Sequence, residues 1–273
     1  MNKIIRTLIC GGQVSLTVLD TTRLVNDAIA IHNTNMQGSA IFGGMLTGGA
    51  YLSSLLKTED ACISVTVKAK EGDGAVSVSS SAALDVRGYV DGSCTQTLVG
   101  GTLTGVREEG DAMPFVGTCE IANDDISDIF SAYFQQSEQI PTAIAIRTDI
   151  GADGKCLAAG GVIMQLLPDA DDDAVDMAGE AFYNYKQCGN ALLELGADGV
   201  YEKFFAHLSG GDKYELYPRY KCSCSEEKII KVLTSVGKAE LLDIVKERGV
   251  VSVHCHYCNK DYVFDGEQIE KIF

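Results

Sequence analysis

The sequence predicts an α+β protein in three parts: a large α+β body over residues 1–172, a helical linker over 173–218 and a small C-terminal domain over 219–273. Three observations lead to this prediction. Strand-like and helix-like patterns are mixed throughout the body. Beyond Pro168 the pattern is helical but is interrupted by glycines. The last part contains two closely spaced pairs of cysteines.

The body is large enough to bury a core of its own. The chain has 273 residues, of which 46% are hydrophobic, so it can form one large domain or a large and a small one. Apolar and polar residues alternate, as in half-buried strands, in QVSLTVLD, CISVTVKA and AVSVSS. Between the first two of these segments, a helix is predicted for SAIFGGMLTGGAYLSSLLK. Its apolar positions are Ile41, Met45, Leu52, Leu55 and Leu56.

Four glycines lie inside this predicted helix, namely Gly43, Gly44, Gly48 and Gly49. Because glycine lowers helix propensity, we expect these positions to allow close packing against a neighbouring element. The glycines match neither GxGxxG nor a phosphate loop ending in GK[ST]. The sequence therefore predicts no nucleotide-binding site.

The second half of the body predicts one helix and two strands. The helix has the amphipathic pattern of DISDIFSAYFQQSEQIP and stops at Pro141. The strands are TAIAIRT and CLAAGGVIMQLLP. The linker follows, and we expect it to form short helices joined at weak points. The interruptions are Gly189, Gly196, Gly199, Gly210 and Gly211.

An acidic run at the start of the linker resembles part of a calcium loop. Asp169, Asp171, Asp173 and Glu180 occupy loop positions 1, 3, 5 and 12. The sixth position, which needs glycine for its turn, is Ala174. The preferred interpretation is an acidic helix N-terminus, where negative charge is stabilising.

The charge distribution argues against a nucleic-acid reader. The net charge is −16, and residues 219–273 contain nine basic and nine acidic residues, so the whole excess lies in the body and linker. The cysteine-rich domain therefore lacks the basic surface that phosphate binding requires. No segment has the roughly 20 apolar residues of a membrane helix, and no signal segment is apparent. We expect a cytoplasmic protein with reduced thiols and no membrane partner.

The two cysteine pairs predict a metal site. Cys222 and Cys224 are followed, after thirty residues, by Cys255 and Cys258. Four soft ligands in two pairs are what a closed tetrahedral zinc site takes, so the flanking His254 and His256 are interpreted as surface residues. A domain this small buries little apolar surface, and structural zinc supplies on the order of 10–16 kcal/mol in small peptides. Removing the metal should therefore loosen the domain.

The sequence around the pairs predicts two helices, a hairpin and a last short helix. The first helix has its apolar positions at Ile229, Val232, Leu233 and Val236, and the second has them at Leu241, Leu242 and Val245. Gly249 is expected to end the second helix. VVSVHCHYCNKDYVF is interpreted as strand, cysteine turn and strand, and Asp265 with Gln268 resembles a capping box.

Three functions are compatible with such a site: a redox switch, a static structural zinc in an interaction module, and a thiol oxidoreductase. In a redox switch, zinc-bound thiolates are open to attack by peroxide. An oxidoreductase would use Cys255 and Cys258, but its CxxC normally begins a helix and needs no CxC partner. Catalysis is not predicted, because His32 and His207 have no identifiable catalytic partners and are interpreted as structural.

Several stretches together resemble the heat shock protein 33 family of redox-regulated holdase chaperones. The resemblance covers nearly the whole chain and rests first on the CxC and CxxC pairs of KCSCSEEKI and HCHYCNKDYVF. It is supported by AYFQQSEQIPTAIAI and LAAGGVIMQLLPDADDD, which occur in the expected order.

This resemblance implies a body, a metastable linker and a zinc-binding redox domain. It implies one Zn²⁺ per chain, held in the reduced form by Cys222, Cys224, Cys255 and Cys258. On oxidation, disulfides would form between Cys222 and Cys224 and between Cys255 and Cys258. Zinc would then leave, the linker would unfold, and a homodimer would hold unfolding client proteins without ATP under oxidative stress.

Six further cysteines lie outside the motif, and each is predicted to be a small core residue. They are Cys10, Cys62, Cys94, Cys119, Cys156 and Cys188. Cys188 lies in the linker, where a disulfide could trap an oxidised or dimeric form.

Overall fold

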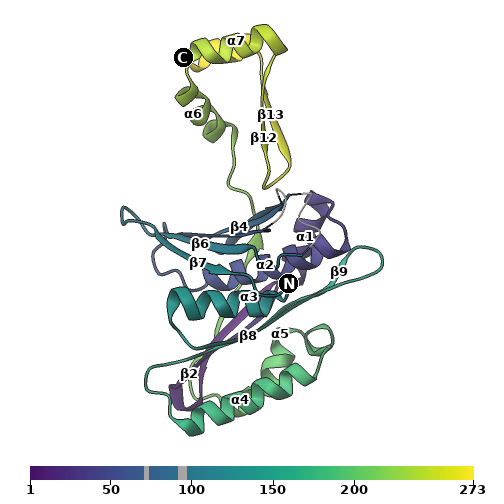
Figure 1. Ribbon diagram of the computed structural model, residues 1–273, viewed down its shortest axis with the longest axis vertical. Helices are drawn as coiled ribbons and strands as arrows, with labels where there is room; N and C mark the ends of the chain where they lie inside the picture. Colours follow the sequence, from purple (N-terminus) through teal and green to yellow (C-terminus); the bar gives the residue numbers. More distant parts are fainter. Residues whose placement is uncertain (71–73, 92–96) are drawn as a thin grey trace. The chain divides into compact units, whose positions relative to one another are not determined.

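The computed structural model describes residues 1–70, 74–91 and 97–273, and these residues form two compact units. The first unit is Met1–Tyr220 and the second is Lys221–Phe273 (Figure 1). Mixed helices and sheets confirm the predicted α+β class.

The first sheet of unit 1 is antiparallel and has the strand order β10-β1-β2-β9-β8. Its strands are β1 (Lys3–Ile9), β2 (Val14–Asp20), β8 (Thr142–Ile150), β9 (Cys156–Leu166) and β10 (Tyr214–Leu216). In β9, residues 158–164 are buried without interruption, because both faces of the sheet are covered. On one face, Leu19 and Ile163 pack in the main core. On the other face, Leu16 and Val162 pack in a second core.

The second sheet of unit 1 has the order β11-β5-β4-β3-β6-β7. Its strands are β3 (Cys62–Lys68), β4 (Ala75–Ser81), β5 (Asp85–Val90), β6 (Thr102–Glu108), β7 (Phe115–Glu120) and β11 (Arg219–Tyr220). β11 pairs in parallel with β5, and the other neighbours are antiparallel. The chain therefore returns to the body just before unit 2 begins.

Helices α1 (Thr22–His32), α2 (Met36–Ser53) and α3 (Ile126–Tyr133) contribute to the main core with strands of both sheets (Figure 1). This unit also contains two short 3-10 helices and one π-helix, namely η1 (Cys10–Gly12), η3 (Ala206–Leu208) and η2 (Phe134–Glu138). The close packing predicted for the glycines of α2 is confirmed. A Cβ atom at Gly48 would lie 2.1 Å from the Phe130 ring, and one at Gly49 would lie 2.5 Å from Val78.

The segment predicted to be the linker forms α4 (Asp172–Gln187) and α5 (Ala191–Phe204). Both helices share the second core with the outer face of the first sheet. The acidic run begins α4: Asp171 accepts a hydrogen bond from the Ala174 amide at 2.8 Å, and this bond lowers the pKa of Asp171. Gly196 interrupts α5 with φ 63° and ψ −176°. The helix break predicted at Gly196 is confirmed, and the break predicted at Gly199 is wrong, because Gly199 lies inside α5 with helical backbone.

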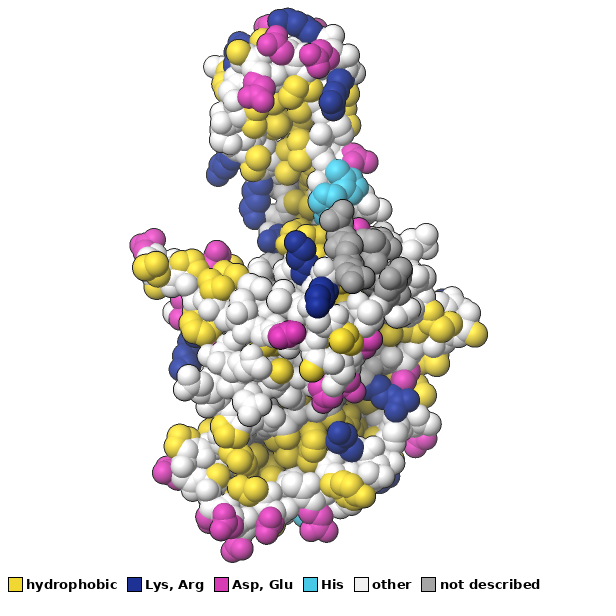
Figure 2. All heavy atoms as spheres, viewed as in Figure 1, with side chains coloured by type: hydrophobic (Ala, Val, Ile, Leu, Met, Phe, Trp, Pro, Cys, Tyr) yellow, Lys and Arg dark blue, Asp and Glu magenta, His cyan; other side chains and the backbone are white. Residues whose placement is uncertain are grey.

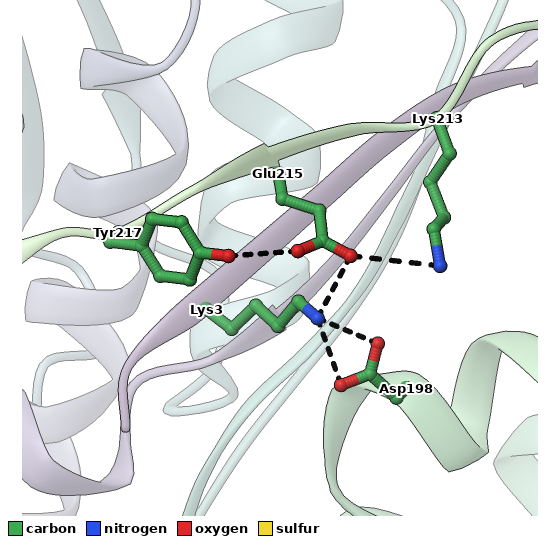
Figure 3. Close-up of polar contacts among 5 residues, drawn as sticks. All are labelled: Lys3, Asp198, Lys213, Glu215 and Tyr217. Atoms are coloured by element: carbon green, nitrogen blue, oxygen red, sulfur yellow. Dashed lines mark hydrogen bonds and ion pairs between the residues drawn. The ribbon is translucent and has the colours of Figure 1, made fainter.

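A polar network fastens this segment to the first strand (Figure 3). The Lys3 ammonium on β1 lies 2.7 Å from Asp198 of α5 and 2.9 Å from Glu215 of β10. Glu215 also lies 3.6 Å from Lys213 and accepts a hydrogen bond from Tyr217 at 2.8 Å. The bond to Asp198 raises the pKa of Lys3, and the bond from Lys3 lowers that of Glu215. One ammonium on β1 therefore contacts two elements, α5 and β10, that are distant from it in sequence.

Replacing this ammonium is expected to loosen α5 and β10. In Lys3→Met, the aliphatic part of the side chain is kept, but Asp198 and Glu215 lose their shared cation. Hydrogen exchange should therefore become faster in α5 and β10 and stay unchanged in β9. The matched control is Lys155→Met, which removes an exposed pair with Asp153 at 3.8 Å. Equal protection of α5 in Lys3→Met and the unmodified chain would contradict this role.

Unit 2 has the elements expected from its sequence. They are α6 (Glu226–Val236), α7 (Lys238–Arg248), β12 (Val251–Cys255), β13 (Lys260–Phe264) and α8 (Gly266–Ile272). Its small core contains Leu233, Leu241, Val251, Phe264 and Ile269. The predicted capping box is confirmed, since Asp265 and Gln268 exchange hydrogen bonds of 2.8 and 2.9 Å. Gly249 ends α7 with φ 84°.

Candidate metal centre

Two segments of unit 2 present the four cysteines. Cys222 and Cys224 lie on the extended segment that leads into α6, whose first turn is capped by Ser225 accepting from the Lys228 amide. Cys255 ends β12, and Cys258 lies in the turn before β13. That turn closes through hydrogen bonds from the Cys258 and Asn259 amides to the Cys255 carbonyl, at 3.3 and 2.8 Å. The sequence predicts turns for both pairs. This prediction is confirmed for Cys255 and Cys258 and is wrong for Cys222 and Cys224, whose segment has neither a turn nor regular secondary structure.

The four sulfurs converge. All four Sγ atoms lie within 4.8 Å of one another. The distance is 3.7 Å between Cys222 and Cys255 and 3.2 Å between Cys224 and Cys258. Four sulfurs bound tetrahedrally at about 2.3 Å from zinc are roughly 3.8 Å apart. The donor type and spacing therefore fit a thiolate metal site. Among the described residues, this is the one group of three or more Cys, His, Asp or Glu side chains placed to hold a metal ion.

The cluster favours negative charge on one of its sulfurs. Burial opposes ionisation of Cys224, but hydrogen bonds from Tyr262 and the neighbouring thiols outweigh it and lower the pKa of Cys224 to about 7. Burial and bonding to neighbouring thiols raise the pKa of Cys258. In the metal-free cluster, the Cys224 thiol therefore ionises more readily than the Cys258 thiol.

The two histidines beside Cys255 are exposed, as predicted, and His254 pairs with Asp261 at 2.7 Å.

Sequence reasoning missed Tyr262, whose hydroxyl donates to Cys224 Sγ at 3.1 Å. The signal was available only indirectly, in the alternation that places Tyr262 on the same face of β13 as buried Phe264. It also missed the partner of His32, whose Nε2 lies 2.9 Å from the Tyr220 hydroxyl.

The structure places the cysteines outside the motif in different environments. Cys10, Cys119 and Cys156 are buried, which confirms the prediction of core positions. Cys62 and Cys188 are only partly buried, so that prediction is wrong for them. Cys62 donates to Glu108 at 3.2 Å, and Cys188 lies 4.0 Å from the Lys203 ammonium. Cys94 lies outside the described residues.

The fold and the site define a protein with a large α+β unit and a separate small unit that carries four converging thiols able to hold a metal ion. Within the described ranges, no helix is both long and apolar enough to span a membrane.

The model of the Hsp33 protein family matches residues 2–265, and the chain belongs to that family. Relatives of full length carry the name 33 kDa chaperonin. That of Bacillus mycoides (strain KBAB4) is 31% identical, over 98% of this chain and 97% of its own length. That of Clostridium novyi (strain NT) is 30% identical, over 99% and 97%. The crystal structure of the 33 kDa chaperonin from Thermotoga maritima matches with a TM-score of 0.84 and 25% identity, over 99% of this chain and 97% of its own.

Proposed function

We propose that this protein is a redox-regulated, ATP-independent holdase chaperone. It is inactive when reduced and zinc-bound, and oxidation of its four-cysteine centre makes it hold unfolding proteins and prevent their aggregation. The observation that carries the proposal is the convergence of four free thiols within 4.8 Å in a chain whose full-length relatives are named chaperonins.

Cys222, Cys224, Cys255 and Cys258 are the proposed ligands of one Zn²⁺ per chain. A bound zinc ion would hold the four sulfurs as thiolates at neutral pH, where a free thiol of pKa about 8.5 is mostly protonated. The protein contributes the segment before α6 and the turn between β12 and β13, which together bring these sulfurs into one cluster.

Oxidation is proposed to form disulfides within each pair. In each, two thiolates lose two electrons and form one S–S bond, while peroxide takes up two electrons and two protons and becomes two water molecules. The sulfur contacts of 3.7 and 3.2 Å run between the pairs, so disulfide mapping by mass spectrometry is informative. Bonds of Cys222 to Cys224 and of Cys255 to Cys258 would leave the two cysteine-bearing segments unconnected, whereas bonds between the pairs would link these segments covalently.

The proposed consequence is that residues 173–218, the linker, leave the first sheet. Departure of α4 and α5 would uncover the outer face of that sheet, which includes Ile5, Leu16 and Val162. Apolar side chains already reach the surface along this segment (Figure 2), among them Tyr183 at 62% and Leu193 at 48% exposure. A contiguous apolar surface of this kind suits unfolding chains, which expose apolar segments of many sequences.

The proposal extends to partners and location. The clients are unfolding proteins, the active form is a homodimer, and the protein acts in the cytoplasm during oxidative stress. Neither nucleic acid nor a membrane is a proposed partner, and no enzymatic step is assigned.

Light scattering of an aggregating client protein tests this function. Without ATP, the oxidised chain is expected to suppress aggregation at a few-fold molar excess or less, and the reduced, zinc-loaded chain to have little effect. Reduction with dithiothreitol and zinc should restore the inactive state. If oxidised and reduced protein behave alike, unit 2 is a static zinc module. Catalysis of thiol exchange with a small disulfide, without suppression of aggregation, would instead favour an oxidoreductase.

A further inference from the structure

Tyr262 joins the two cysteine-bearing segments of unit 2. It lies on β13, four residues after Cys258, and faces Val253 across the hairpin. Its ring packs against the small core, and its hydroxyl donates to Cys224 Sγ at 3.1 Å. We propose that Tyr262 is a positioning residue of the metal centre, which holds the Cys224 thiolate and slows its loss to oxidants. This inference rests on the proposed zinc site and extends it beyond the four ligands.

The placement of the tyrosine is set by the strand. Asp261 and Val263 are exposed, while Tyr262 and Phe264 point toward the opposite, core-facing side of the hairpin. The ring is therefore held by packing, and the hydroxyl needs no reorganisation to reach the sulfur. A strand that follows the CxxC turn thus contacts a sulfur of the CxC segment.

A hydrogen bond to a thiolate has two effects. It stabilises the negative charge on sulfur, and it withdraws electron density, which makes the sulfur a weaker nucleophile. Donors behind metal ligands also orient them, and loss of such a partner typically costs 10–100-fold in metal affinity. Cys224 Sγ lies 3.2 Å from Cys258 Sγ, so a displacement of Cys224 also disturbs the pair formed by Cys255 and Cys258.

The test is Tyr262→Phe in the full-length chain, which keeps the ring and removes the hydroxyl. Competition with a chelator should show Zn²⁺ affinity reduced by about 10-fold. Zinc release by peroxide should be faster by a similar factor. In the Co²⁺-loaded reduced chain, the sulfur-to-cobalt charge-transfer band should move to longer wavelength, because the sulfur becomes more electron-rich. A purely structural role would not move this band.

Tyr183→Phe removes an exposed phenol from α4 and is the matched control, expected to leave all three measurements unchanged. If Tyr262→Phe does not fold, 3-fluorotyrosine in place of Tyr262 keeps the ring with a stronger donor and should shift the band to shorter wavelength. Unchanged affinity, release rate and band in the folded variant would overturn the inference. All three measurements start from reduced, metal-loaded protein and follow the metal centre. Their outcome therefore does not depend on whether the oxidised chain holds client proteins.

Discussion

Cys258→Ser is expected to unfold residues 221–273 while the main core of unit 1 stays folded. The core of unit 2 is small. In zinc-finger peptides, binding of structural zinc contributes on the order of 10–16 kcal/mol of folding free energy. Replacing one of four thiolates removes much of that free energy, because serine is a poor ligand for zinc. Hydrogen exchange of the full-length variant should show complete loss of protection in α6, α7 and the β12–β13 hairpin, with β9 still protected.

The matched control is Cys188→Ser, a partly buried cysteine of unit 1 that lies outside the cluster. It should retain the protection of unit 2 and one zinc per chain. Chelation of zinc from the unmodified protein should reproduce the Cys258→Ser pattern. Native protection of unit 2 after either treatment would show that its apolar core is sufficient without metal.

Gly161→Ala should strongly destabilise unit 1. Gly161 lies in β9, paired on one side with Ile146 of β8 and on the other with Leu19 of β2. A Cβ atom there would lie 2.0 Å from the Ala145 carbonyl oxygen, which is backbone and cannot rotate away. The two strands must separate, and overpacking of this kind costs about 3 kcal/mol. The melting temperature of unit 1 should fall by about 6–12 °C.

Gly179→Ala is the control for this substitution, because a Cβ atom on that exposed face of α4 meets nothing within 4 Å. Alanine is favoured over glycine inside a helix by about 1 kcal/mol, so this variant should be unchanged or slightly more stable. An unaltered melting temperature in Gly161→Ala would mean that the strands accommodate a methyl group at this point.

Local patterns predicted the elements that depend on neighbouring residues. Alternation identified β2, β3 and β4, and the capping residues identified the start of α8. The four cysteines could be identified because two close pairs of soft ligands are typical of a tetrahedral zinc site. The family resemblance added the expected redox chemistry, which spacing by itself leaves open beside a static zinc.

Features that depend on contacts between distant residues were not predictable in this way. Lys3 gave no sign that it would join Asp198 and Glu215, about two hundred positions away. Cys62 and Cys188 were expected in the core because cysteine is usually buried, but their positions at a strand start and a helix end leave them partly exposed. The hydroxyl of Tyr262 contacts Cys224 only once the hairpin and the CxC segment have folded together.

The central claim is that oxidation of the four-cysteine centre releases zinc and frees α4 and α5 from the first sheet. The most direct test follows zinc release with a chromogenic chelator and, in the same peroxide-treated sample, hydrogen exchange of α4 and α5 in short pulses. We predict that protection of α4 and α5 is lost during or after zinc release, while β9 stays protected, and that reductant with zinc restores both. Zinc release with full protection of α4 and α5 would contradict this claim, as would loss of their protection before any zinc leaves.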